Sequence, residues 1–209
     1  MITEEKINSN YILWIERLKK YNCYSDEMIN EIGDKIKLAS FSLGTTTGSA
    51  YCGSMIDTVL NHLCTIAYHI NEDAFGLNAK QKDKHPFLKV NSDSLMRVLL
   101  LQHISKAELF VPQSEQWKIN KGYPFEFNGE LLSSLKTGER SIFLCQKYDV
   151  KLKEDEYEAM RIIDKEEDFK NNSYANPLST IVRIANQFVA IETYRKSVVK
   201  NIQKETIEI

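Results

Sequence analysis

The chain has 209 residues and carries 27 Lys and Arg against 29 Asp and Glu, a formal net charge of -2. This balance argues against a nucleic-acid coat or a polybasic membrane-binding protein. Hydrophobic residues make up 43% and charged residues 27%, as in a soluble globular domain, and the length favours a single domain over residues 1–209. With 8 Gly and 4 Pro, the chain has few residues for the tight turns of a β-sandwich.

The termini and cysteines narrow the class of protein further. No run of 18 apolar residues predicts a membrane span, and Met1–Lys6 lacks the basic and apolar regions of a signal peptide, so we expect a cytoplasmic protein. The four cysteines form no Cys-x-x-Cys pair, which argues against a zinc site or a disulfide framework. We expect small buried hydrophobes or inert thiols at Cys23, Cys52, Cys64 and Cys145. No cofactor is predicted.

Two helices are predicted at the N-terminus. Apolar residues at helical spacing span residues 4–21, with Tyr11, Trp14 and Ile15 among them. A second helix begins after Ser25, whose side chain can cap the free amides of the first turn. The first helix is expected either to cover the rest of the fold or to join a partner.

The middle of the chain predicts two further helices separated by irregular segments. Residues 41–49 form a polar loop, and a long amphipathic helix follows from about 52 to 71. Residues 72–91 are charged and irregular, which is typical of an exposed connection. Ser92-Asp93 is predicted to cap the next helix, and its run over 95–101 is apolar on nearly every side, so we expect this helix to be central.

The pattern changes to alternation over residues 116–128, which predicts a short β-hairpin around Asn120-Lys121-Gly122. A two-stranded ribbon cannot bury both of its faces by itself. Either some of its aromatic side chains form a contact surface for a protein partner, or all of them pack on the helices. These aromatic residues are Trp117, Tyr123, Phe125 and Phe127.

Helical patterns return at about 138–148, 154–164 and 177–199, and the polar tail over 200–209 either extends the last helix or frays. The fold class is therefore predicted to be all-α, a bundle of about seven or eight helices with one small inserted β-hairpin.

Five short segments stand out in chain order: Ala50–Thr58 (AYCGSMIDT), Leu99–Ala107 (LLLQHISKA), Lys136–Ser141 (KTGERS), Asp155–Ile163 (DEYEAMRII) and Ala185–Phe188 (ANQF). They resemble motifs of the HD-domain phosphohydrolases, particularly a phage and gut-bacterial type with a hairpin between the second and third motifs. The family patterns are Ala-Tyr-Glu-Gly-Gly-Leu-x-Asp-His, Leu-Leu-His-Asp-Ile-Cys-Lys-Ala, Gly-His-Gly-Glu-Lys-Ser, Glu-Glu-x-x-Ala-Ile-Arg-Trp-His, and Ala-Asp followed by two apolar residues. The resemblance covers about residues 50–196, leaves 1–40 outside it, and implies an HD-domain-like helical bundle.

The resemblance also implies that the metal site of the family is degenerate here. In the family, four His and two Asp hold one or two divalent metals that activate a water for attack on phosphorus. The corresponding positions are Thr58, Gln102, His103, Thr137, Ile163 and Asn186. Thr, Gln and Asn are poor ligands for a divalent cation without a carboxylate beside them, and Ile cannot ligate one. One histidine does not assemble a catalytic site that needs three protein ligands.

Three basic residues persist inside the matched motifs: Lys106, Arg140 and Arg161. They are candidates for binding a nucleotide or another phosphorylated ligand. The alternative is that they form ordinary ion pairs with Glu139, Asp155 or Glu158.

Two other groups of residues are candidate metal sites. His62 and His69 lie seven residues apart on one helix, too far for the usual i, i+4 pair of ligands. His62 and His103 on two central helices, joined by Asp57, form a conceivable site. The alternative for these histidines is an ordinary core or boundary position.

We therefore expect a catalytically inactive HD-like domain that acts as a structural, assembly or regulatory protein-binding module of a phage, located in the host cytoplasm or the virion. The first alternative is a non-hydrolysing binder of a phosphorylated small molecule. The second is a metal-dependent phosphohydrolase with an altered site around His103. Neither a membrane nor a nucleic acid is an expected partner.

Overall fold

The computed structural model describes residues 2–45, 49–73, 90–131, 134–163 and 176–207 of the chain. Helices dominate it, and the one sheet has two strands. The helices are α1 (Glu4–Lys20), α2 (Asp26–Leu38), α3 (Ser54–Thr58), the π-helical turn η1 (Val59–Leu63), α4 (Cys64–Asp73), α6 (Ser92–Leu101), α7 (Lys106–Leu109), α8 (Gln116–Asn120), α9 (Thr137–Lys147), α10 (Glu154–Arg161) and α12 (Pro177–Ile207). The strands are β1 (Phe110–Pro112) and β2 (Phe125–Phe127).

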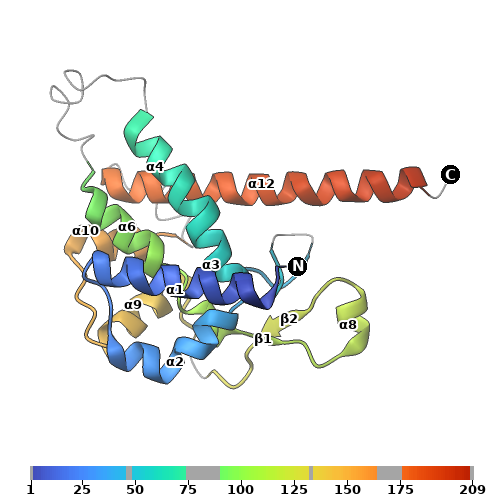
Figure 1. The fold of residues 1–209 in the computed structure, drawn as a ribbon, viewed down its shortest axis with the longest axis horizontal. Helices are drawn as coiled ribbons and strands as arrows, with labels where there is room; N and C mark the ends of the chain where they lie inside the picture. The colour runs from blue at the N-terminus through green and yellow to red at the C-terminus, as the bar shows by residue number, and fades with distance from the viewer. Residues whose placement is uncertain (1, 46–48, 74–89, 132–133, 164–175, 208–209) are drawn as a thin grey trace.

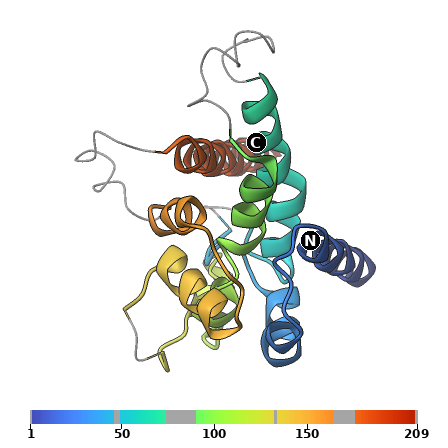
Figure 2. The ribbon, with the colours of Figure 1, turned by 90° about the vertical axis from the view of Figure 1, so that its left-hand side faces the viewer.

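Helix α6 lies at the centre of the bundle, as the sequence predicts. In Figure 2, α9 and α10 flank it on one side, and α1 with the α3–η1–α4 helix flanks it on the other. Its residues Leu95 and Val98–Leu101 are buried, so apolar side chains face helices in every direction. The predicted cap at Ser92-Asp93 was wrong by one residue: the Asn91 side chain accepts a hydrogen bond from the Ser94 amide at 3.0 Å and caps the first turn.

Helix α1 covers the bundle, the first of the two alternatives for the N-terminal helix. Trp14 and Leu18 are fully buried, and the Trp14 indole donates a hydrogen bond to the Leu100 carbonyl of α6 at 3.2 Å. At the other end of the chain, α12 continues through residues 200–207 and projects past the rest of the helical body (Figure 1).

The inserted hairpin exists, and its second predicted strand contains β2, but the first predicted strand was wrong. Strand β1 pairs antiparallel with β2 so that Phe110 lies opposite Phe127, and Trp117 belongs to the short helix α8 between them. Gly122 adopts φ +89°, and the Tyr123 amide bonds the Lys118 carbonyl at 3.0 Å. These are features of a helix C-terminus, where a left-handed glycine ends the last turn, so this glycine ends α8 instead of forming a hairpin turn.

Three of the four cysteines, Cys23, Cys64 and Cys145, are buried as expected, whereas Cys52 is exposed. Burial raises the pKa of the Cys23 thiol to about 12, of Cys64 to about 11 and of Cys145 to about 12, so these thiols are neutral at physiological pH.

Within the part of the chain that the structure describes, no helix has both the length and the hydropathy to cross a membrane.

A buried arginine on α6 joins the α1–α2 turn, the segment before α10 and α10 itself. Arg97 on α6 donates from Nε to Glu156 Oε1 at 3.0 Å, and both side chains are almost fully buried. Its Nη1 donates to the carbonyls of Tyr21 and Asn22 in the α1–α2 turn, and its Nη2 donates to the Lys151 carbonyl before α10. The charge of Glu156 is therefore compensated inside the core, and the positions of α1, α6 and α10 become interdependent.

Replacing Arg97 with Met is expected to lower the free energy of unfolding by about 3–5 kcal/mol, because Glu156 would remain buried without its cation. Urea denaturation measures this loss. The ion pair between Lys147 and Glu31, 2.8 Å apart at the surface, provides the control, and Lys147→Met should have a much smaller effect. Adding Glu156→Leu to Arg97→Met should recover part of the loss. Equal effects of Arg97→Met and Lys147→Met would contradict the role given to Arg97.

Candidate functional site

Three of the six positions that the motif resemblance singles out meet in one hydrogen-bonded network between α6 and α12. Asn186 Nδ2 on α12 donates to Gln102 Oε1 at 2.9 Å and to the Val182 carbonyl at 2.8 Å. Since that nitrogen is the donor, Asn186 Oδ1 accepts, and His103 Nε2, 3.0 Å away, carries the proton. His103 Nδ1 is then left with a lone pair.

The imidazole of His103 is neutral. Its burial, with a smaller contribution from the nearby Lys106 ammonium, holds its pKa well below the usual 6.5. The Phe41 ring packs edge-on against it at 5.0 Å between centroids. A protein-bound cation would need ligands that compensate its charge, and the network offers neutral amides and a neutral ring.

A fourth position joins this network through two buried serines. Ser141 Oγ on α9 donates to the Gln102 carbonyl at 2.9 Å and lies 3.0 Å from Ser105 Oγ. Ser105 Oγ in turn donates to the Thr137 carbonyl at 2.8 Å, so Thr137 contributes its backbone.

The remaining two positions contribute no hydrogen bond to the network. Thr58 is buried, and its hydroxyl has no hydrogen-bond partner among the described residues. Ile163 packs, half-buried, against the hydrophobic core.

The other candidate metal residues have separate partners. Asp57 accepts hydrogen bonds from Asn10 and Asn61 on Oδ1 at 2.9 and 2.7 Å, and from the Tyr51 hydroxyl on Oδ2 at 2.7 Å. His62 Nδ1 lies 3.0 Å from Glu192 Oε2 on α12. In the described ranges no three His, Cys, Asp or Glu side chains gather closely enough to hold a metal ion.

Two of the three candidate ligand-binding cations bond to groups of the protein itself. Lys106 is buried, donates to the Phe41 carbonyl and lies 3.7 Å from the centre of the Phe41 ring. Arg140 donates from Nε and Nη2 to Glu108 Oε2 at 2.9 and 2.7 Å. This is the ion-pair alternative, with Glu108 as partner instead of the three expected carboxylates. Arg161 lies half-buried at the end of α10.

The aromatic residues of the insertion divide between core and surface. We call residues 110–128 the arm, which contains β1, α8 and β2. Phe125 is 7% exposed, whereas Trp117, Tyr123 and Phe127 are 55%, 49% and 65% exposed. The alternative in which all four rings pack on the helices is therefore wrong, since only Phe125 packs inward and three rings remain at the surface.

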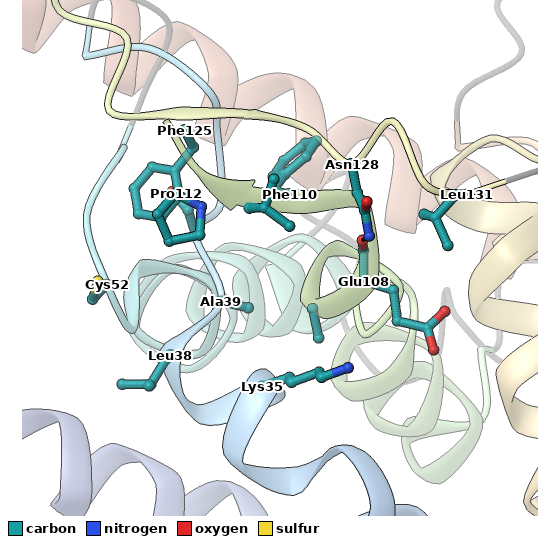
Figure 3. A pocket seen from close by; sticks show the side chains of 13 residues that line it. Lys35, Leu38, Ala39, Cys52, Glu108, Phe110, Pro112, Phe125, Asn128 and Leu131 are labelled. Atoms are coloured by element: carbon teal, nitrogen blue, oxygen red, sulfur yellow. Dashed lines mark hydrogen bonds between the residues drawn. The ribbon is translucent and has the colours of Figure 1, made fainter. Parts of the chain in front are cut away.

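Apolar cavities lie on two sides of Phe125 at the base of the arm. Figure 3 shows the first, of about 360 Å³, which Phe110, Phe125 and Leu38 line, with Lys35 and Glu108 among its polar residues. A second cavity of about 480 Å³ shares Cys52, Pro112 and Phe125 with the first. Phe110, which the sequence analysis did not single out, also packs edge-on against Phe127 at 5.4 Å. The apolar run at residues 109–111 was the available signal for it.

Comparison with protein-family models, with curated proteins and with solved structures gives no match to this chain.

The neutral state of His103 predicts a pH dependence of stability. The unfolded chain binds a proton near pH 6.5 and the folded chain does so only at lower pH, so stability is complete above pH 6.5 and declines below it. We expect His103 to account for a loss of stability on the order of 1 kcal/mol between pH 7.5 and pH 5.5. Urea denaturation of the wild type and of His103→Gln measures it, and the variant should lose less over this interval. Parallel pH profiles would contradict the prediction.

Proposed function

We propose that this chain is a non-catalytic protein-binding module, in which a degenerate HD-like helical core presents the arm to a protein partner. The observation that carries this proposal is the exposure of three aromatic rings, Trp117, Tyr123 and Phe127, on one short insertion. Aromatic side chains are enriched in the buried centres of protein interfaces, where a few of them supply most of the affinity.

Backbone hydrogen bonds join the arm to the loop before α3 and to the end of α7, so its backbone does not have to be ordered by binding. The Thr45 amide donates to the Gly122 carbonyl at 2.8 Å, and the Asn128 amide donates to the Leu109 carbonyl at 2.9 Å. A Cβ at Gly44 would lie 3.0 Å from the Tyr123 ring, so this glycine allows the ring to pack on the backbone. An ordered surface loses less conformational entropy on association, which favours binding.

Charge around Trp117 indicates the character of the partner surface. The ammonium groups of Lys118 and Lys121 lie 5.6 and 4.9 Å from the centre of its ring. Lys118 is already paired with Glu115 at 3.0 Å, so an apolar pocket that meets the Lys121 charge at its rim would complement this part of the arm.

The network of Gln102, His103 and Asn186 supports the non-catalytic part of the proposal. Under the motif resemblance, these three positions belong to the metal site of an HD phosphohydrolase. Here the hydrogen bonds among them satisfy the amide of Asn186 and fix the proton of His103, and the groups carry no negative charge for a divalent ion.

Replacing Trp117 or Phe127 with Ala is expected to weaken binding of the partner about 30-fold, because truncation of a central interface aromatic costs at least about 2 kcal/mol. The partner would first be isolated from an extract of the source cell, and its affinity for each purified variant measured by calorimetry. Phe143→Ala is the matched control, since this ring on α9 is 47% exposed and lies outside the arm. Equal affinities of all variants, or a chain that stays monomeric and captures nothing, would overturn the proposal.

A second prediction concerns catalysis. With Mn²⁺ or Mg²⁺ present, the purified protein is expected to show no turnover of nucleotides or phosphodiesters, because the network lacks the carboxylates that hold such ions. A hydrolysis panel and metal analysis check this. Robust turnover that disappears in His103→Ala would replace the non-catalytic proposal with the altered phosphohydrolase.

A further inference from the structure

A groove on another part of the molecule combines positive charge with aromatic walls. It lies between the C-terminal half of α1, the η1–α4 helix and α6, and encloses about 320 Å³. Arg17, Lys20, Tyr21, Thr65 and Tyr68 supply its polar groups, and Leu60, Cys64 and Met96 complete its lining. It contains no arm residue, and none of the described residues that line it is a carboxylate.

We propose that this groove binds a small organic anion that carries a phosphate or carboxylate group on a flat ring. The volume is within the range of small-ligand pockets, and the two cations supply the charge that an anion requires. This proposal is independent of the protein-binding role proposed for the arm.

Arg17 lines the groove beside an uncharged neighbour. Cys64 also lines it, and burial keeps that thiol neutral by raising its pKa to about 11. Guanidinium has five donors arranged to match two oxygens of a phosphate or carboxylate. An anion in the groove would therefore accept charge-assisted hydrogen bonds from Arg17.

Lys20 and the tyrosines define the other half of the site. The Lys20 ammonium lies 5.3 Å from the centre of the Tyr21 ring, which places charge and aromatic surface side by side. Tyr68 stands on the opposite helix and is 60% exposed, so its ring is accessible. A flat ring bound between the tyrosines would stack on them while its anionic group reaches the cations.

The position of these cations at the end of α1 has a simpler explanation, because basic residues at a helix C-terminus interact favourably with its dipole. The two explanations differ in their residues. The dipole would favour Lys19 as much as Lys20, whereas Lys19 lies over Tyr24 at 4.7 Å and does not line the groove.

Thermal unfolding of the full chain with added AMP, phenyl phosphate, benzoate, adenosine or inorganic phosphate tests the proposal. At about ten times its dissociation constant, a bound ligand should raise the midpoint by about 3–6 °C. AMP or phenyl phosphate should do so if phosphate is recognised, and benzoate if carboxylate is. The shift should persist in Lys19→Gln and disappear in the double variant Arg17→Gln with Lys20→Gln.

If the double variant does not fold, the single variant Lys20→Gln still tests the proposal. Lys20 is exposed, so its replacement should leave the fold intact. The dissociation constant of this variant for the active compound, measured by calorimetry, should rise about tenfold. Three results would overturn the proposal: no shift with any compound, equal shifts with inorganic phosphate alone, or binding that Lys20→Gln leaves unchanged.

Discussion

The four acceptors of the Arg97 guanidinium form the constraint on which the arrangement of the bundle depends. An apolar core of Leu, Ile and Val side chains tolerates many packings of similar energy. A buried guanidinium beside a fully buried carboxylate does not, because each donor left without an acceptor and each charge left without a partner costs free energy. The α1–α2 turn, the segment before α10 and Glu156 have to meet at one point of α6 for this cost to be avoided.

The groove and the network of Gln102, His103 and Asn186 depend on what this arrangement brings together. With the turn after α1 bonded to Arg97, α1 packs against α6 and α3, and the groove with Arg17 and Lys20 lies between α1, the η1–α4 helix and α6. Helix α10, fixed through Glu156, packs against α12, which carries Asn186 to Gln102 and His103. The arm is separate from this chain of contacts and is fixed by backbone bonds to residues 43–45 and 109. Its sequence is therefore free to serve a surface role.

Local signals in the sequence predicted the helices well and failed where the decisive contacts are long-range. The Ser25 cap and the apolar run of α6 are local, and the structure confirms both. Trp117 and Ile119 alternate over too short a stretch to distinguish a strand from one helical turn, and the partner strand Phe110–Pro112 was hidden in an apolar continuation of α7. Arg97 was one charge in an apolar run, and its partners are 54 to 76 residues away in the chain. No local pattern shows such a contact.

At the motif positions, the sequence shows which residue types are present but not the hydrogen bonds that form among them. Carboxylates that converge on an empty metal site repel one another, and an apo-protein built that way depends on its ion for stability. Gln102 and Asn186 are neutral, and their hydrogen bond together with that of His103 holds α6 and α12 together without an ion. If these residues occupy former ligand positions, as we propose, their replacement freed the fold from its metal. A scaffold of this kind keeps its surface in place whether or not a metal ion is bound.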